Sequence, residues 1–100
     1  MNPGEFMLTV IARIVAKPEF RSKVREELIK LIEPTHIEVG CIDYVMHEDN
    51  GDPNTFIFFE NWESEELLDK HLASPHLTHY LNASKDWLAD FHIHRMTKVA

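Results

Sequence analysis

The chain has 100 residues, enough for one domain around a single hydrophobic core. Apolar residues make up 44% and charged residues 27%, as in ordinary globular proteins, and the formal net charge is −7. This acidic balance argues against nucleic acid and anionic membranes as partners, because both select basic surfaces. Cys41 is the only cysteine, which excludes an intramolecular disulfide. No apolar run reaches the length of a membrane span, so a cytoplasmic protein is expected.

The first half of the chain predicts a strand and then a helix. Residues 1–6 do not fit the pattern that follows, and we interpret them as a disordered leader or cloning remnant before one domain over 7–100. Residues 8–16 (LTVIARIVA) are apolar and rich in β-branched side chains, which predicts a central strand. Pro18 opens a helix with apolar residues at helical spacing, and Pro34 should bend or end it.

The second half predicts a hairpin, two short helices and a last strand. Residues 41–48 and 55–62 read as strands around a polar turn. Ser64 is placed to cap a short helix, and Ser74 with Pro75 begins another that runs to about residue 87. A strand over 91–99 completes the order β-α-β-β-α-β. That order indicates the α+β class and the ferredoxin-like fold, an antiparallel sheet with helices on one face.

Two of these strands are apolar on both faces. A sheet with helices on one side and water on the other should alternate apolar with polar residues. The chain has no further element to cover the second face, so the pattern predicts a homodimer joined sheet to sheet. The residues that carry this argument are Leu8, Val10 and Ile14 against Ile11 and Val15, and Phe56 and Phe58 against Ile57 and Phe59.

The segment from Glu60 to Tyr80 gathers most of the residues capable of acid–base or stacking chemistry. His71 follows Leu67 and Leu68 by four and three residues, which places it on the apolar face of its helix, as a core histidine or a general base. Tyr80 shares a helix face with His76, and a buried hydroxyl there needs a partner or a substrate oxygen.

Trp62 and Glu60 lie next to this helix in the sequence. Trp62 can stack on a planar ligand or simply close the core. Glu60 alternates onto the same strand face as Phe58 and Trp62, so it is either a buried carboxylate that needs a partner, such as a histidine, or a solvated residue at the sheet end.

Seven histidines raise the question of a metal site. His76 and His79, and His92 and His94, are the close pairs, but neither has a carboxylate or cysteine at a recognisable ligand spacing. Glycine-rich phosphate loops and nucleophile elbows are absent as well. The sequence therefore predicts neither a metal nor a cofactor.

Two strings together resemble a known family. G-C-I-D-Y-V-M-H-E-D over 40–49 and F-I-F-F-E-N-W-E-S-E-E-L-L-D-K-H-L-A-S-P-H-L-T-H-Y over 56–80 resemble the antibiotic biosynthesis monooxygenase (ABM) domain, in particular its small quinol-monooxygenase-like members. The resemblance implies a dimeric α+β barrel with an apolar pocket in each subunit. It also implies oxidation of small electron-rich aromatics, quinols or anthrones, by O₂ without metal or flavin.

Carried over residue by residue, the resemblance assigns roles to the candidates above. His71 would be the base, and Tyr80 and His76 would hydrogen-bond substrate oxygens. Aromatic walls would come from Trp62, Phe58 and Tyr44.

Three other activities stay open. Haem-degrading members of the family carry Asn, Trp and His where this chain has Ala12, His71 and Leu81, although His76 or His79 could ligate haem instead. Other relatives isomerise a phosphorylated diketone and would need basic residues, for which Arg13 and Arg95 are the strand candidates. The third alternative is a non-catalytic dimer that binds a small ligand.

Overall fold

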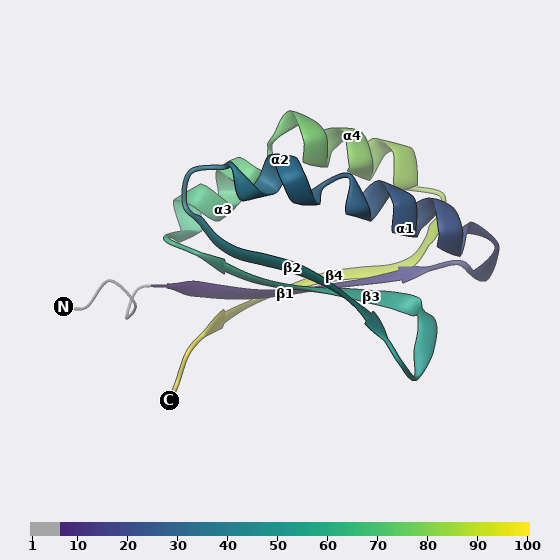
Figure 1. Cartoon of the computed structure of the whole chain (residues 1–100), viewed down its shortest axis with the longest axis horizontal. Helices are drawn as coiled ribbons and strands as arrows, with labels where there is room; N and C mark the ends of the chain where they lie inside the picture. Colours follow the sequence, from purple (N-terminus) through teal and green to yellow (C-terminus); the bar gives the residue numbers. More distant parts are fainter. Residues whose placement is uncertain (1–6) are drawn as a thin grey trace.

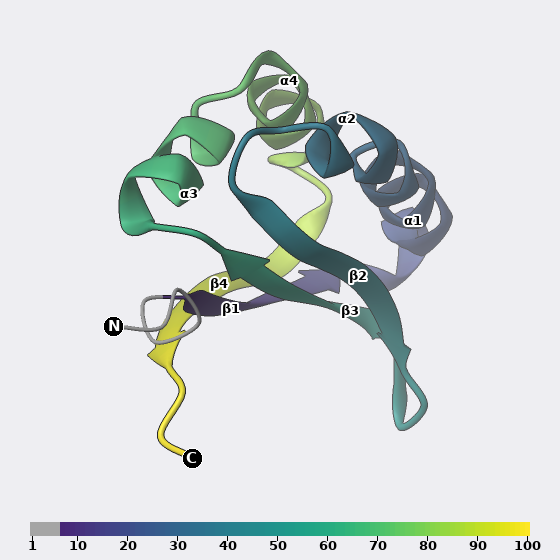
Figure 2. The ribbon, with the colours of Figure 1, turned by 60° about the vertical axis from the view of Figure 1, so that its left-hand side comes forward.

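The computed structural model of the protein describes residues 7–100, and the expected leader over 1–6 lies outside this part. Four antiparallel strands form one sheet in the order β2-β3-β1-β4, and the helices cover one of its faces (Figures 1 and 2). No helix of the described part is long and apolar enough to cross a membrane. The elements are β1 (Leu8–Ala16), η2 (Pro18–Phe20), α1 (Arg21–Ile29), α2 (Ile32–His36), β2 (Cys41–Asp49), β3 (Asp52–Trp62), α3 (Glu65–Leu72), α4 (Pro75–Ser84) and β4 (Leu88–Thr97).

The predicted ferredoxin-like fold is confirmed, with shifts at the element boundaries. The first helix is divided into η2, α1 and α2, and Pro34 lies inside α2 rather than at its end. Pro34 is tolerated because it is the third residue of the helix, where a backbone N–H would have no partner within the helix. Strand β4 starts at Leu88, three residues before the predicted start, and α4 correspondingly ends at Ser84.

Serine caps fix where the two C-terminal helices begin. The Ser64 hydroxyl accepts a hydrogen bond from Leu67 N–H at 3.2 Å, and the Ser74 hydroxyl accepts one from Leu77 N–H at 3.3 Å. Each cap satisfies a backbone donor that the first helical turn leaves free. The break between α3 and α4 is therefore encoded locally by Ser74 and Pro75, as the sequence predicted.

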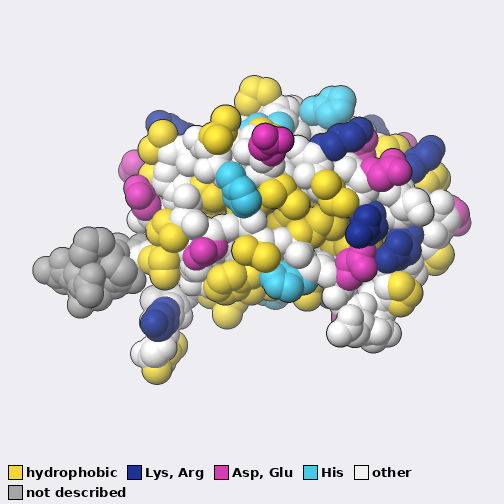
Figure 3. Space-filling view, viewed as in Figure 1, with side chains coloured by type: hydrophobic (Ala, Val, Ile, Leu, Met, Phe, Trp, Pro, Cys, Tyr) yellow, Lys and Arg dark blue, Asp and Glu magenta, His cyan; other side chains and the backbone are white. Residues whose placement is uncertain are grey.

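The helix-covered face of the sheet holds the core. Alternate residues of β1 and β3 point under the helices and are buried: Val10, Ala12, Ile14 and Ala16, with Phe56, Phe58, Glu60 and Trp62. Outside this core, charged side chains of both signs lie over the helical layer in Figure 3. Hydrophobic side chains come to the surface between that layer and the sheet edge.

The opposite face of the sheet carries the remaining side chains of the same strands. The β1–β3 register places Ile11 opposite Phe59, and β2 adds Val45 beside Phe59. Phe59 and Val45 remain 39% and 47% exposed, and no helix of the described part lies over them (Figure 2). The apolar character of both faces, expected from the sequence, is thus a property of this fold.

Gly40 is the residue that turns the chain into β2. Its φ of +88° is a conformation that residues with a side chain rarely adopt. A Cβ atom at this position would also lie 2.8 Å from Cβ of Leu67, on α3.

Replacing this glycine should therefore destabilise the fold. We expect Gly40→Ala to lower the free energy of unfolding by roughly 2 kcal/mol, measured by urea denaturation. Gly51→Ala is the matched control, because its nearest neighbour would be the Asp49 carboxylate at an ordinary 3.4 Å and it should change stability by less than about 0.5 kcal/mol. Equal effects of the two substitutions would contradict the backbone argument.

Candidate functional site

A small, mostly apolar cavity lies between the sheet and the helices. Its walls are aliphatic and aromatic side chains from β1, β3, β4 and the helical layer. Four of the residues that line it have polar side chains, Tyr44, Glu60, His71 and Tyr80. Its volume is about 30 Å³, space for a water molecule or two. Charges and dipoles act strongly in such a place because little water screens them.

His71 reaches this cavity from the inner face of α3. The residue is 2% exposed, and its ring packs 4.7 Å from the Trp62 ring and 5.5 Å from the Tyr44 ring, between centroids. Nδ1 lies 2.6 Å from Oε2 of Glu38. Because a carboxylate oxygen only accepts, Nδ1 carries the hydrogen and Nε2 keeps its lone pair.

The protonation of His71 is set by two opposing effects. Burial lowers the pKa of His71, and the hydrogen bond and negative charge of Glu38 only partly offset it. The imidazole is therefore neutral at pH 7, with one basic nitrogen. A carboxylate behind a neutral imidazole also stabilises the imidazolium that forms when Nε2 takes up a proton. This arrangement gives His71 the properties that a general base needs.

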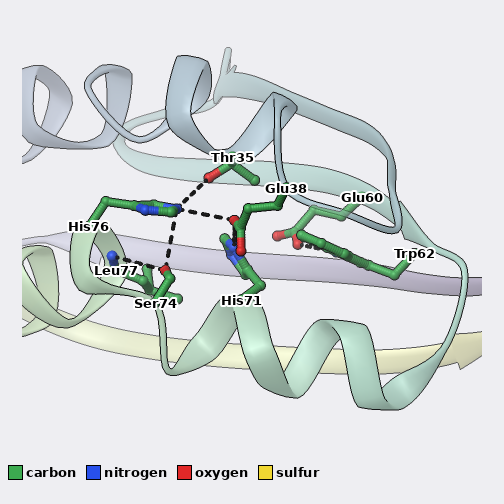
Figure 4. Close-up of polar contacts among 8 residues, drawn as sticks. All are labelled: Thr35, Glu38, Glu60, Trp62, His71, Ser74, His76 and Leu77. Carbon is green, nitrogen blue, oxygen red and sulfur yellow. Dashed lines mark hydrogen bonds and ion pairs between the residues drawn. The ribbon is translucent and has the colours of Figure 1, made fainter.

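Glu38 is the site residue that sequence analysis missed. It lies in the loop between α2 and β2, two residues before Gly40, and accepts hydrogen bonds from both His71 and His76 (Figure 4). His76 Nε2 lies 3.1 Å from the same Glu38 oxygen. Glu38 is 33 residues from its histidine partner, so no local spacing could reveal the pair. The one available signal was a glutamate two residues before a glycine that precedes a strand.

Glu60 is a second buried carboxyl group with a different partner. The Trp62 indole N–H donates to its Oε1 at 2.9 Å, so the predicted need for a partner is met by tryptophan rather than histidine. Burial raises the pKa of Glu60 to about 7, although the hydrogen bond from Trp62 opposes this rise. Glu60 therefore loses its proton near neutral pH.

Tyr80 is a buried tyrosine among the residues that line the cavity. The side chain is 1% exposed, and its hydroxyl makes no hydrogen bond of regular geometry within residues 7–100, although the equally buried Ser84 hydroxyl lies near it. Burial raises the pKa of Tyr80 to about 12, so the hydroxyl keeps its proton. A buried donor left free is costly and is rare in folded proteins. A ligand oxygen in the cavity would satisfy it.

The fold brings five of the seven predicted site residues to the cavity: His71, Tyr80, Glu60, Phe58 and Tyr44. Trp62 lies behind the His71 ring and holds Glu60. His76 faces Glu38, Thr35 and Ser74 and lines an outer groove beside His79 instead. Glu38, His71 and His76 also offer ligand atoms within 4.8 Å of one another, the donor types that transition metals bind.

The pKa of Glu60 makes stability depend on pH. Between about pH 4.5 and 7 the unfolded chain has lost this proton while the folded chain retains it, so the free energy of unfolding falls as pH rises. The loss from this group amounts to roughly 3 kcal/mol. We expect Glu60→Gln, which keeps an acceptor for Trp62, to flatten that slope in urea denaturation from pH 5 to 8. The exposed Glu63→Gln should leave it intact, and an unchanged slope in Glu60→Gln would refute the assignment.

Comparison with known proteins identifies relatives that are similar in sequence to this chain. The chain is 31% identical to the "Probable quinol monooxygenase YgiN" of Escherichia coli, over 87% of this chain and 93% of that protein. It is 38% identical to the "Putative monooxygenase Rv0793" of Mycobacterium tuberculosis, over 73% of this chain and 71% of that protein. A Synechocystis protein, sll1783, is 37% identical over 82% of this chain, which spans 56% of that protein's length.

Solved structures agree with the sequence relatives. The crystal structure of PA3566 from Pseudomonas aeruginosa has a TM-score of 0.90 at 28% identity, covering 95% of this chain and 96% of that one. The structure of Rv0793 has a TM-score of 0.88 at 29% identity, covering 94% and 96%. The sequence pattern of the family described as antibiotic biosynthesis monooxygenase matches residues 7–83. The chain therefore belongs to the antibiotic biosynthesis monooxygenase (ABM) family.

Proposed function

We propose that this protein is a cofactor-independent monooxygenase that oxidises a small electron-rich aromatic, a quinol or an anthrone, with O₂. The observation that carries the proposal is the buried His71, held by Glu38 at 2.6 Å with its other nitrogen free, at an apolar cavity. Relatives named as monooxygenases, one of them a quinol monooxygenase, support the reaction class.

The chemistry needs a base and a dry pocket more than a cofactor. His71 Nε2 removes the phenolic or activated C–H proton, and the resulting anion passes one electron to O₂. The radical pair recombines to a peroxide, which loses water and leaves a carbonyl on the substrate. One oxygen atom stays on the substrate, and the other is reduced to water by two electrons that the substrate also supplies. The reaction therefore balances as substrate plus O₂ giving product plus water.

The other polar groups of the cavity have separate tasks. The Tyr80 hydroxyl, which keeps its proton and lacks a partner, donates to a substrate oxygen and stabilises the charge that develops there. Tyr44 and Phe58, whose rings lie 4.6 Å apart, form an aromatic wall for the substrate ring. Glu38 touches no substrate in this arrangement and is a positioning residue.

Substrate entry requires the cavity to widen. Its volume of about 30 Å³ is far below the roughly 150 Å³ that holds a benzene ring in a protein core. Leu72 and Phe91 line the cavity and are partly exposed, so outward rotation of these side chains is the simplest way to open it.

The alternative activities find less support in the site. Arg95 pairs with Asp69 on α3, and Arg13 pairs with Asp90, and neither arginine lines the cavity as a phosphate site would need. Leu81, at the position where haem-degrading members carry histidine, is 37% exposed and does not line the cavity either.

The assembly we propose is a homodimer formed through the open face of the sheet. Ile11, Phe59 and Val45 make an apolar row across three strands of that face. At one end Thr9 donates to Asn61 at 2.7 Å and Asn61 donates to Asp43 at 2.8 Å, which satisfies the polar groups among themselves. A second copy would cover an apolar patch that is costly to leave in water.

A charge at the centre of this face should separate the subunits. We expect Phe59→Lys to sediment as a monomer at micromolar concentration, where the unaltered protein sediments as a dimer. Leu81→Lys is the matched control, because Leu81 is equally exposed, 37% against 39%, but lies on α4. A monomeric unaltered protein would overturn the proposed assembly.

Removing the base should remove turnover. We expect His71→Ala to reduce O₂ uptake with a reduced naphthoquinol to the background of spontaneous oxidation, because no other group at the cavity carries a free basic nitrogen within residues 7–100. Glu38→Gln should lower kcat at least about a hundredfold with little change in KM, because an amide no longer holds the required tautomer.

Two controls accompany this test. His79→Ala removes an exposed histidine of α4 and should leave oxygen uptake unchanged. Circular dichroism of each variant should match that of the unaltered protein. Unchanged kcat in His71→Ala would exclude His71 from the mechanism, and absence of O₂ uptake with every quinol would reject the oxygenase assignment.

A further inference from the structure

We propose that Glu38, His71 and His76 form a binding site for one divalent transition-metal ion of the Zn²⁺ class, and that its occupation is mutually exclusive with the use of His71 as a base.

The geometry of the three donors is close to that of a coordination shell. His71 Nδ1 and His76 Nε2 lie 2.6 and 3.1 Å from the same Glu38 oxygen, and the three ligand atoms fall within 4.8 Å of one another. Ligand atoms around a tetrahedral zinc, with bonds of about 2.0–2.1 Å, are about 3.3 Å apart. To bind the ion, the Glu38 oxygen would move away from Nδ1 of His71, from 2.6 Å to about 3.3 Å, and the two imidazole nitrogens would settle at a similar separation.

The surroundings of His76 Nε2 suit a metal ion better than a single N–H hydrogen. Its Nε2 has three oxygen neighbours, Glu38 at 3.1 Å and the hydroxyls of Thr35 and Ser74 at 3.3 Å (Figure 4). One N–H can serve only one of them well. An ion bound by Nε2 and Glu38 would instead carry a water molecule able to donate to both hydroxyls, as the outer partners of metal sites do.

The donor set selects the kind of metal. Two imidazoles and one carboxylate suit Zn²⁺, Co²⁺ or Fe²⁺, whereas Ca²⁺ and Mg²⁺ prefer oxygen ligands. Three protein ligands leave the fourth tetrahedral position to water. Access exists from solvent, because the side chains of Glu38 and His76 are 18% and 22% exposed and His76 lines the outer groove.

Metal binding changes what His71 presents to the cavity. The ion takes the lone pair of Nδ1, so the single hydrogen of the neutral ring moves to Nε2. Nε2 then carries an N–H and no longer accepts a proton. This inhibitory consequence rests on the proposed function, whereas the metal site itself does not.

Calorimetry with ZnCl₂ and metal-stripped protein tests the site without using activity. We expect one equivalent to bind, at least about tenfold more weakly in Glu38→Gln and His76→Asn. Control variants His79→Asn and His94→Asn should bind Zn²⁺ as the unaltered protein does. His94 is chosen because His92 and His94 form the other close histidine pair, with 4.2 Å between ring centroids. Co²⁺ should give the visible absorption of a tetrahedral ion. No binding below about 100 µM, or binding that survives Glu38→Gln and His76→Asn, would overturn the site.

Oxygen uptake provides the second measurement. One equivalent of Zn²⁺ should suppress O₂ uptake, and a chelator should restore it. In His76→Asn the ratio of the uptake rates with and without Zn²⁺ should approach one. Uptake that persists or rises with the site filled would overturn the mutual exclusion. Zinc binding at the site in a protein that never consumes O₂ would instead reject the proposed function and leave the metal site standing.

Discussion

The hydrogen bond between Glu38 and His71 is the interaction on which the site depends. It joins the loop before β2 to the inner face of α3, across the layer between the helices and the sheet. An imidazole buried without a partner would be costly, and the carboxylate removes that cost while fixing which ring nitrogen carries the hydrogen. One contact therefore stabilises the packing of α3 and sets the chemistry of the cavity.

This contact relies on a turn that only glycine makes easily. Gly40 reverses the chain with φ of +88° and approaches Leu67 on α3 so closely that a side chain would not fit. Glu63 N–H also donates to the Gly40 carbonyl at 2.9 Å, which ties the loop to the end of β3. The loop that holds Glu38 is thus fixed by one backbone hydrogen bond and by close packing against the Leu67 side chain, so the carboxylate is positioned before any ligand arrives.

The sequence predicted what local patterns encode and missed what the fold brings together. The apolar runs of β1 and β3 and the caps at Ser64 and Ser74 predicted the order of the elements, and helical spacing placed His71 inward. Glu38 was not predicted because it reaches His71 only through tertiary packing. The same limit applies to Glu60, whose strand face was predicted but whose partner, Trp62, follows from the side-chain geometry of the folded protein.

The two glutamates near the cavity have the same side chain but different exposure and different hydrogen-bond donors. Glu60 is 4% exposed and has a single indole donor, so burial dominates and its pKa rises to about 7. Glu38 keeps a side chain that is 18% exposed and receives two imidazole donors. An ionised Glu60 would oppose an anionic substrate beside it. A carboxyl group that can stay protonated lets the cavity accept the anion that the proposed oxidation requires.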